Sequence, residues 1–179
     1  MRFVAFLRNV NLGQPKSPSR AQLENAFQQA GTDHAASFLS NGTLVYTAPG
    51  RRAAEQMAKQ ARETLRAQCG MSEPIFVHGL ADLADLATGD PFAAFRRTDY
   101  TERAISFFER RAGAKLRAPL ESERGDCLVF RIEAGLALSL MRTIGGKTGY
   151  PTPVLEKALG APVTTRSWRT IERLLDRHG

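Results

Sequence analysis

The sequence predicts an α+β fold of two ferredoxin-like halves in tandem, each of the β-α-β-β-α-β type, with mostly antiparallel sheets and helices packed on one face. Over the first 78 residues, strand-like and amphipathic helical patterns alternate in that order. After residue 93 a similar order recurs without its first helix. We therefore expect a first half over residues 1–78, a connecting helix over 79–92 and a less regular second half over 93–179.

In the first half, apolar periodicity and end signals define the elements. Strands are expected at residues 3–10, 43–47 and 74–77, and helices at residues 20–30 and about 52–69. Ser19 and Gln22 form a capping-box pattern before the first helix, and Gly31 provides its end. The Asn41-Gly42 pair lies between strand-forming residues, which is consistent either with a two-residue hairpin turn or with an irregular entry to the next strand.

In the second half, the polar segment 112–125 predicts a loop with a short helical turn. Strands are expected at residues 103–108, 127–132, 136–141 and 163–165, and helices over 152–159 and from about 168 onward. Pro153 in the first turn and Gly160 at the end delimit the first of these helices. Either Thr165 or Ser167 is expected to cap the last one.

Composition indicates a folded, basic protein. The chain of 179 residues is 42% hydrophobic and 24% charged, with a net charge of +7. No apolar run approaches the roughly 18 residues that span a bilayer, and the start of the chain lacks a signal-peptide pattern. Cys69 and Cys127 stand apart and predict reduced thiols in a cytoplasmic protein. The excess of arginine favours acidic ligands or nucleic acid, although genome composition alone could also produce it.

Three segments carry recognisable motifs. Residues 3–13 are an aliphatic strand followed by a polar turn, residues 39–46 combine an Asn-Gly step with a strand, and residues 163–171 read Val-Thr-Thr-Arg-Ser-Trp-Arg-Thr-Ile. In order and spacing they resemble the signatures of an uncharacterised bacterial family, domain of unknown function 1697. The resemblance implies an α+β fold and a cytosolic bacterial protein. It implies no activity, because the family has none assigned.

The motifs depart from the family's pattern at polar positions. Asn9 replaces a glycine, Asn41-Gly42-Thr43 replaces a Ser-Gly-Asn step, and Ser167 and Arg169 replace the asparagines around the tryptophan. If these positions bind a ligand, this chain is expected to bind it differently.

The C-terminal motif is the best candidate binding site. A helix start presents free N–H groups and the positive end of the helix dipole, which together suit a phosphate or carboxylate. Arg166 and Arg169 would add charge, and Thr165 and Ser167 would add hydroxyls. The alternative is structural, with the hydroxyl residues capping the helix and Arg166 paired with an acid.

Further candidate ligands are Arg8 and Asn11 at the end of the first strand, and Lys147 in a glycine-rich loop. A cation leaving an apolar strand needs a partner, so a structural ion pair is the alternative for Arg8. Gly145-Gly146-Lys147-Thr148 is not a phosphate-binding P-loop, because Met141 occupies the position of its first glycine.

Other mechanisms have little support in the sequence. The histidines are far apart and no metal-ligand spacing is present, so we expect neither a metal nor a cofactor. The nucleophile elbow of serine hydrolases and the RNP1 motif of RNA-binding sheets are also absent. A binding protein for an anionic small molecule or nucleic acid ranks first. A self-associating interaction protein, such as a homodimer, ranks second, and a small enzyme acting on a phosphorylated or carboxylated metabolite ranks third.

Overall fold

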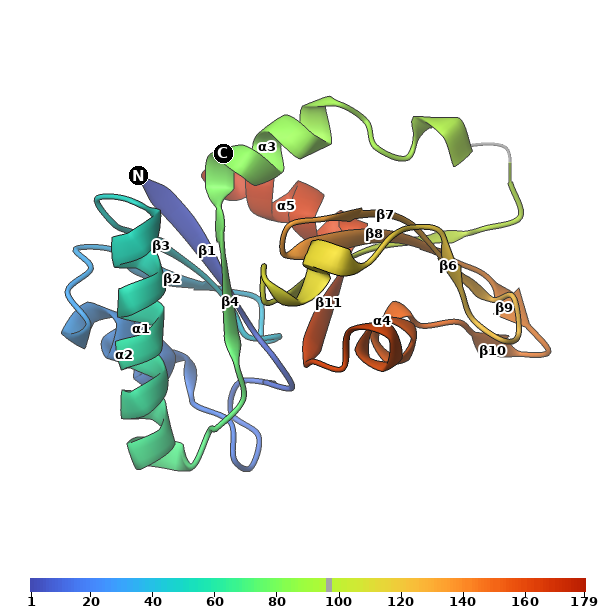
Figure 1. Ribbon diagram of the computed structural model, residues 1–179. Coiled ribbons are helices and arrows are strands. Elements are labelled where there is room, and N and C mark those ends of the chain that lie inside the picture. Colours follow the sequence, from blue (N-terminus) through green and yellow to red (C-terminus); the bar gives the residue numbers. More distant parts are fainter. Residues whose placement is uncertain (96–97) are drawn as a thin grey trace. The chain divides into compact units, whose positions relative to one another are not determined.

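The computed structural model describes residues 1–95 and 98–179, which form two compact units (Figure 1). The first unit comprises residues 1–85 with the last three residues, 177–179, and the second comprises residues 86–176. The chain passes from one to the other within helix α3 (Leu80–Thr88). Within the described residues, every helix is too short or too polar to cross a membrane.

The first unit is an antiparallel sheet covered on one face by two helices. Its elements are β1 (Arg2–Leu7), α1 (Arg20–Gln29), β2 (Ala35–Phe38), β3 (Thr43–Thr47), α2 (Arg51–Cys69) and β4 (Ile75–Gly79). The strand order is β2-β3-β1-β4, and every pair is antiparallel. Alternate residues of β1 and β3, including Phe3 and Tyr46, pack against α1 and α2. The Tyr46 hydroxyl donates to the Ala54 carbonyl at 2.8 Å, which ties the sheet to α2.

Two local predictions in this unit need correction. The first strand ends at Leu7 rather than at Val10, because the backbone turns at Asn9, whose φ is 50°. The Asn41-Gly42 pair does lie in a hairpin, but β2 and β3 are joined by the four residues 39–42, since Phe38 pairs with Thr43. The two-residue turn is therefore wrong.

The second unit is built on a five-stranded antiparallel sheet of order β11-β5-β8-β7-β6. Its strands are β5 (Glu102–Phe108), β6 (Leu120–Glu121), β7 (Cys127–Glu133), β8 (Leu136–Met141) and β11 (Val163–Ser167). A separate hairpin is formed by β9 (Thr143–Ile144) and β10 (Lys147–Thr148). The helices are η1 (Ala93–Phe95), η2 (Ala112–Lys115), α4 (Pro151–Leu159) and α5 (Trp168–His178).

Helices α4 and α5 pack on opposite faces of this sheet (Figure 1). Leu155 of α4 belongs to the same buried cluster as Phe108 of β5, and Val154 packs against the cluster that contains Ala104. The neighbouring strand residue Arg103 points to the other face, where its guanidinium lies 5.5 Å from the centre of the Phe92 ring. That ring contacts Trp168 of α5 with centroids 5.1 Å apart.

The prediction of two ferredoxin-like halves in tandem is not confirmed, although the α+β class and the antiparallel sheets are. Between β5 and β7 the second unit has η2 and the short strand β6 instead of an α-helix. The expectation of helices on one face is wrong for this unit, because both faces of β5 are apolar and each is covered.

Candidate functional site

The predicted C-terminal site lies where β11 passes directly into α5 in the second unit. Ser167 is the last residue of the strand and Trp168 the first of the helix. Trp168 is buried and anchors the helix start against Phe92. Along β11, Thr165 and Ser167 face one side of the sheet, while Thr164 and Arg166 face the other, because side chains alternate along a strand.

Thr165 belongs to a chain of three hydroxyls. Its Oγ1 lies 2.8 Å from Ser106 Oγ on β5 and 2.8 Å from Thr152 Oγ1 in the first turn of α4. A hydroxyl can donate one hydrogen bond and accept others, so the three groups satisfy one another. Thr165 therefore connects two strands and a helix.

Ser167, rather than Thr165, caps α5. Its Oγ accepts a hydrogen bond from the Thr170 backbone N–H at 3.3 Å and lies 2.9 Å from Thr170 Oγ1. The prediction left both residues open as the cap. Ser167 is nevertheless exposed, so its hydroxyl can be approached from solvent.

Arg166 is a buried cation with hydrogen bonds to its own strand. It is 7% exposed, and its Nη1 donates to Thr164 Oγ1 and to the Thr165 carbonyl, both at 2.9 Å. Burial lowers the pKa of Arg166 to about 10, while nearby Tyr150 acts in the opposite direction. The guanidinium thus stays charged at neutral pH.

Arg169 differs from Arg166 in being exposed, in the first turn of α5. Among the residues that the structure describes, it has no ion-pair partner. The strand–helix junction therefore presents one exposed arginine beside an exposed hydroxyl.

Lys147 lies elsewhere in the second unit, on the exposed β9–β10 hairpin. Gly145 and Gly146 form its turn with φ values of 58° and 74°. The structure shows no contact that brings Lys147 to Arg169. The hairpin is followed by Pro151 and Pro153 in α4, so no helix starts directly after the glycines.

Arg8 and Asn11 belong to the first unit. Arg8 Nη1 lies 2.5 Å from Glu73 Oε2 in a half-buried ion pair, the structural alternative that the sequence left open. The exposed Asn11 donates its backbone N–H to Ser17 Oγ at 3.3 Å. Of the predicted residues, only those from Thr165 to Arg169 are thus adjacent to one another.

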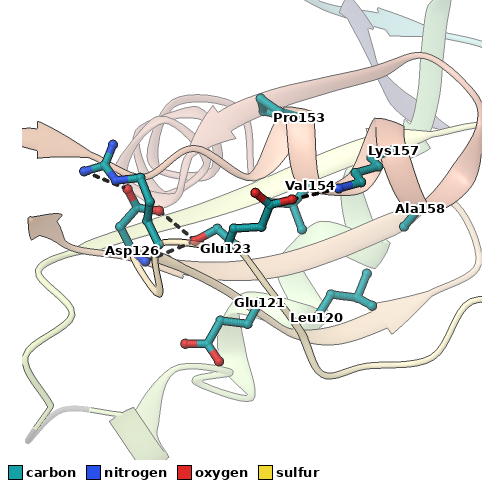
Figure 2. A pocket seen from close by; sticks show the side chains of 10 residues that line it. Leu120, Glu121, Glu123, Asp126, Pro153, Val154, Lys157 and Ala158 are labelled. Carbon is teal, nitrogen blue, oxygen red and sulfur yellow. Dashed lines mark hydrogen bonds and ion pairs between the residues drawn. The ribbon is translucent and has the colours of Figure 1, made fainter.

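A groove of about 530 Å³ lies on the second unit between α4 and the turn that joins β6 to β7 (Figure 2). Its size is in the range of small-molecule sites. It is lined by Leu120, Glu121, Ser122, Glu123, Arg124, Asp126, Pro153, Val154, Lys157 and Ala158. The sequence predicted residues 112–125 as a loop but gave no sign of this groove, because its other wall comes from α4.

Most of the charges around the groove are neutralised by one another. Lys157 Nζ lies 2.9 Å from Glu123 Oε1 across its mouth (Figure 2). The buried Asp126 accepts from Ser122 Oγ at 2.7 Å and lies 3.3 Å from Arg124 Nη2. The hydrogen bond and the charge of Lys157 lower the pKa of Glu123. The groove therefore has an apolar floor, and most of the charged side chains at its rim are in ion pairs.

In the described part of the chain, the structure shows no candidate metal cluster, and the Cys127 thiol is inaccessible. No group of three His, Cys, Asp or Glu side chains there is close enough to hold an ion. Cys127 is fully buried at the start of β7, and its burial, with a smaller effect of Asp126, raises its thiol pKa to about 12. A protonated, inaccessible thiol is a poor nucleophile.

Comparison with known proteins defines the family. The family described as "Protein of unknown function (DUF1697)" matches residues 1–136, and the chain belongs to it. The match ends before β11, so the C-terminal motif lies outside it. The chain is also similar to the structure of a conserved bacterial protein, SP0830 from Streptococcus pneumoniae, with a TM-score of 0.69 and 15% identity. That similarity covers 98% of this chain and 97% of the other, and it concerns the fold. No curated protein matches the sequence significantly.

Proposed function

We propose that this protein binds a small anionic ligand, a phosphate- or carboxylate-bearing metabolite, at the start of α5. The observation that carries the proposal is the exposed guanidinium of Arg169, which has no ion-pair partner among the described residues and lies in the first turn of a helix. The ligand would meet Arg169, the Ser167 hydroxyl and the N–H groups of the first turn other than that of Thr170, which donates to Ser167 Oγ.

The physical argument rests on the positive charge at this end of the helix and on the hydrogen-bond donors found there. Unpaired N–H groups and the helix dipole give the start of a helix a partial positive charge. Arginine adds a planar pair of donors that matches two oxygens of a phosphate or carboxylate. The buried Arg166 adds a fixed charge next in sequence to Ser167, from the opposite side of the sheet. The start of α4 is a weaker site, because Pro151 and Pro153 have no N–H to donate.

The test is a titration of inorganic phosphate and small carboxylates, followed by calorimetry and by NMR of the arginine Nε–H groups. Arg169→Ala should weaken binding about tenfold, the loss of one charge-assisted hydrogen bond or more. The matched control is Arg173→Ala, because Arg173 is also exposed on α5 but lies one turn further along. Equal losses in both variants, or no binding by the unmodified protein, would contradict the proposal.

The two alternatives rest on fewer observations. Self-association would need an apolar surface, and among the described residues the exposed large apolar side chains are Met1, Ile144 and Tyr150. Sedimentation at several protein concentrations tests for a homodimer. A small enzyme would find room for its substrate in the groove beside α4, and turnover of any metabolite that binds there is the test for it.

We further propose that the second unit is a modified copy of the ferredoxin-like plan of the first. The main strands of each unit can be numbered one to four in chain order, with β6 left out. In both sheets the fourth strand then lies beside the first, the first beside the third and the third beside the second. The two orders are β4-β1-β3-β2 and β11-β5-β8-β7. Superposition of these strands, one unit on the other, tests this idea.

The two unpaired cysteines, Cys69 and Cys127, support a cytoplasmic location, which cell fractionation can check.

A further inference from the structure

We propose that a second basic surface, formed by Arg110, Arg111, Lys115 and Arg117, binds the phosphate backbone of double-stranded nucleic acid. These residues follow β5 in the second unit, within eight positions of one another, and all four are exposed. We call this surface the basic turn. It differs from the proposed small-anion site in its residues and in the class of its ligand.

Within the described residues, the cations of the basic turn are not paired with carboxylates, and the exposed Glu109 beside Arg110 still leaves residues 109–117 with a net charge of +3. Within the described residues, Arg110, Arg111 and Lys115 have no ion-pair partner. Other cations of the same unit do have one, as Arg124 with Asp126, Arg131 with Glu133 and Arg142 with Asp99. The basic turn is therefore a local excess of positive charge rather than part of an evenly mixed surface.

The backbone that carries these cations is held by hydrogen bonds and by a close contact with the Phe108 ring. Ala112 N donates to the Glu109 carbonyl at 3.0 Å, and Leu116 N donates to the Gly113 carbonyl at 3.1 Å, which closes the short helix η2. Gly113 is buried against the Phe108 ring, so closely that a Cβ there would lie 2.5 Å from a ring carbon. An ordered segment loses less conformational entropy on binding than a flexible tail.

Two side chains of the basic turn are also positioned. The Arg117 guanidinium donates to the Ala114 and Leu116 carbonyls, each at 3.0 Å. The aliphatic stem of Arg110 lies against Gly135 in the β7–β8 turn, where a Cβ would come within 2.9 Å of Arg110 Cγ. The side chains of Arg111 and Lys115 are the ones available to contact phosphates, so they are the residues to substitute.

The chemistry of the surface favours a duplex over a single strand. Single strands are held largely by bases stacked on aromatic rings, and residues 109–117 contain no aromatic side chain. Exposed arginine and lysine side chains bind phosphates, and a duplex presents phosphates at a higher density than a single strand does. Binding should therefore be independent of base sequence and strongly dependent on salt.

The test is fluorescence anisotropy with a labelled duplex of about 20 base pairs, titrated at several salt concentrations. For the double variant Arg111→Ala/Lys115→Ala, the log–log salt slope should fall by about 1.8, or about 0.9 for each cation removed, and affinity should drop at least about tenfold at low salt. The control is Arg52→Ala/Lys59→Ala, which removes the same net charge from exposed positions of α2. Circular dichroism of both variants checks that each is folded.

The proposal predicts that the control variant binds the duplex within about twofold of the unmodified protein. It also predicts that Arg169→Ala changes the salt slope by clearly less than about 0.9, the change that the loss of one phosphate contact would produce. It is overturned if the control loses as much affinity as the test variant, since net charge alone would then explain binding. It is also overturned if the duplex does not bind, or if vesicles containing phosphatidylserine bind and the duplex does not. Because the small-anion site is tested with phosphate and Arg169, either proposal can fail without the other.

Discussion

The hydroxyl of Thr165 lies 2.8 Å from that of Ser106, although 59 positions separate the two residues in the chain. Ser106 is fully buried, and the same Thr165 hydroxyl lies 2.8 Å from Thr152 at the start of α4. This link joins β11 to β5 and to the start of α4. The exposed Ser167 and Arg169 follow two and four residues further along the chain, so the link supports the strand that leads into the proposed anion site.

Replacing Thr165 by valine should destabilise the protein by about 1–2 kcal/mol, because the buried Ser106 hydroxyl loses its partner while the shape of the side chain is kept. Urea unfolding measures the change. Thr101→Val is the control, since Thr101 is exposed just before β5, and its stability should change by less than about 0.5 kcal/mol. Equal effects of the two substitutions would show that the hydroxyl chain contributes nothing.

Ser139→Ala should change the stability of the protein in the opposite direction to Thr165→Val. Ser139 is fully buried on β8 between Ala104 and Val129, and among the described residues its Oγ has no hydrogen-bond partner. A buried hydroxyl without a partner costs about 1–3 kcal/mol, part of which alanine recovers. We expect a variant that is unchanged or up to about 1 kcal/mol more stable, measured by the same unfolding titration. A clear loss of stability would mean that Ser139 has a partner in solution.

Gly149→Ala should be severely destabilising. A Cβ at Gly149 would lie 2.2 Å from the backbone oxygen of Asp126, and backbone cannot move aside as a flexible side chain can. We expect a loss of more than about 3 kcal/mol or failure to fold, as for other overpacked positions. Gly145→Ala is the control, because no atom lies within 4 Å of its added Cβ and only its φ of 58° opposes alanine. Thermal unfolding should separate the two variants clearly, and similar melting temperatures would contradict this account.

Local signals in the sequence were reliable where a few neighbouring residues determine the structure. The capping box is confirmed, since the Gln22 N–H donates to Ser19 Oγ and the Ser19 N–H donates to Gln22 Oε1. Gly160 ends α4 in the left-handed region, with φ of 62°, as its position predicted. These features depend on contacts within one turn of helix, which is the range over which sequence patterns carry information.

Features that depend on distant residues could not be predicted. The need for a partner of Arg8 followed from its place at the end of an apolar strand, but Glu73 lies 65 positions away and nothing in the sequence singles it out. A threonine shortly before a helix is often its cap, so the sequence makes Thr165 a candidate cap. Only the pairing of β11 with β5 places it beside Ser106. The α4 groove has the same cause, because its walls are separated in sequence by β7–β10.

The buried thiol of Cys127 should make stability fall at alkaline pH. Its pKa is raised from an ordinary value of 9.0 to about 12, mainly by burial, so the folded protein keeps a proton that the unfolded chain releases. A group whose pKa is higher in the folded state stabilises fully below the unfolded value, and this contribution disappears as the pH rises from about 9 to about 12. Urea midpoints at pH 8, 9 and 10 should therefore decrease more steeply in the unmodified protein than in Cys127→Ala. The other side chains are the same in both proteins, so the difference between the slopes isolates the thiol. In Cys69→Ala, where Cys127 is the remaining cysteine, a thiol reagent should react only after urea is added, whereas reaction of the folded protein at the rate of an unfolded chain would show that Cys127 is accessible.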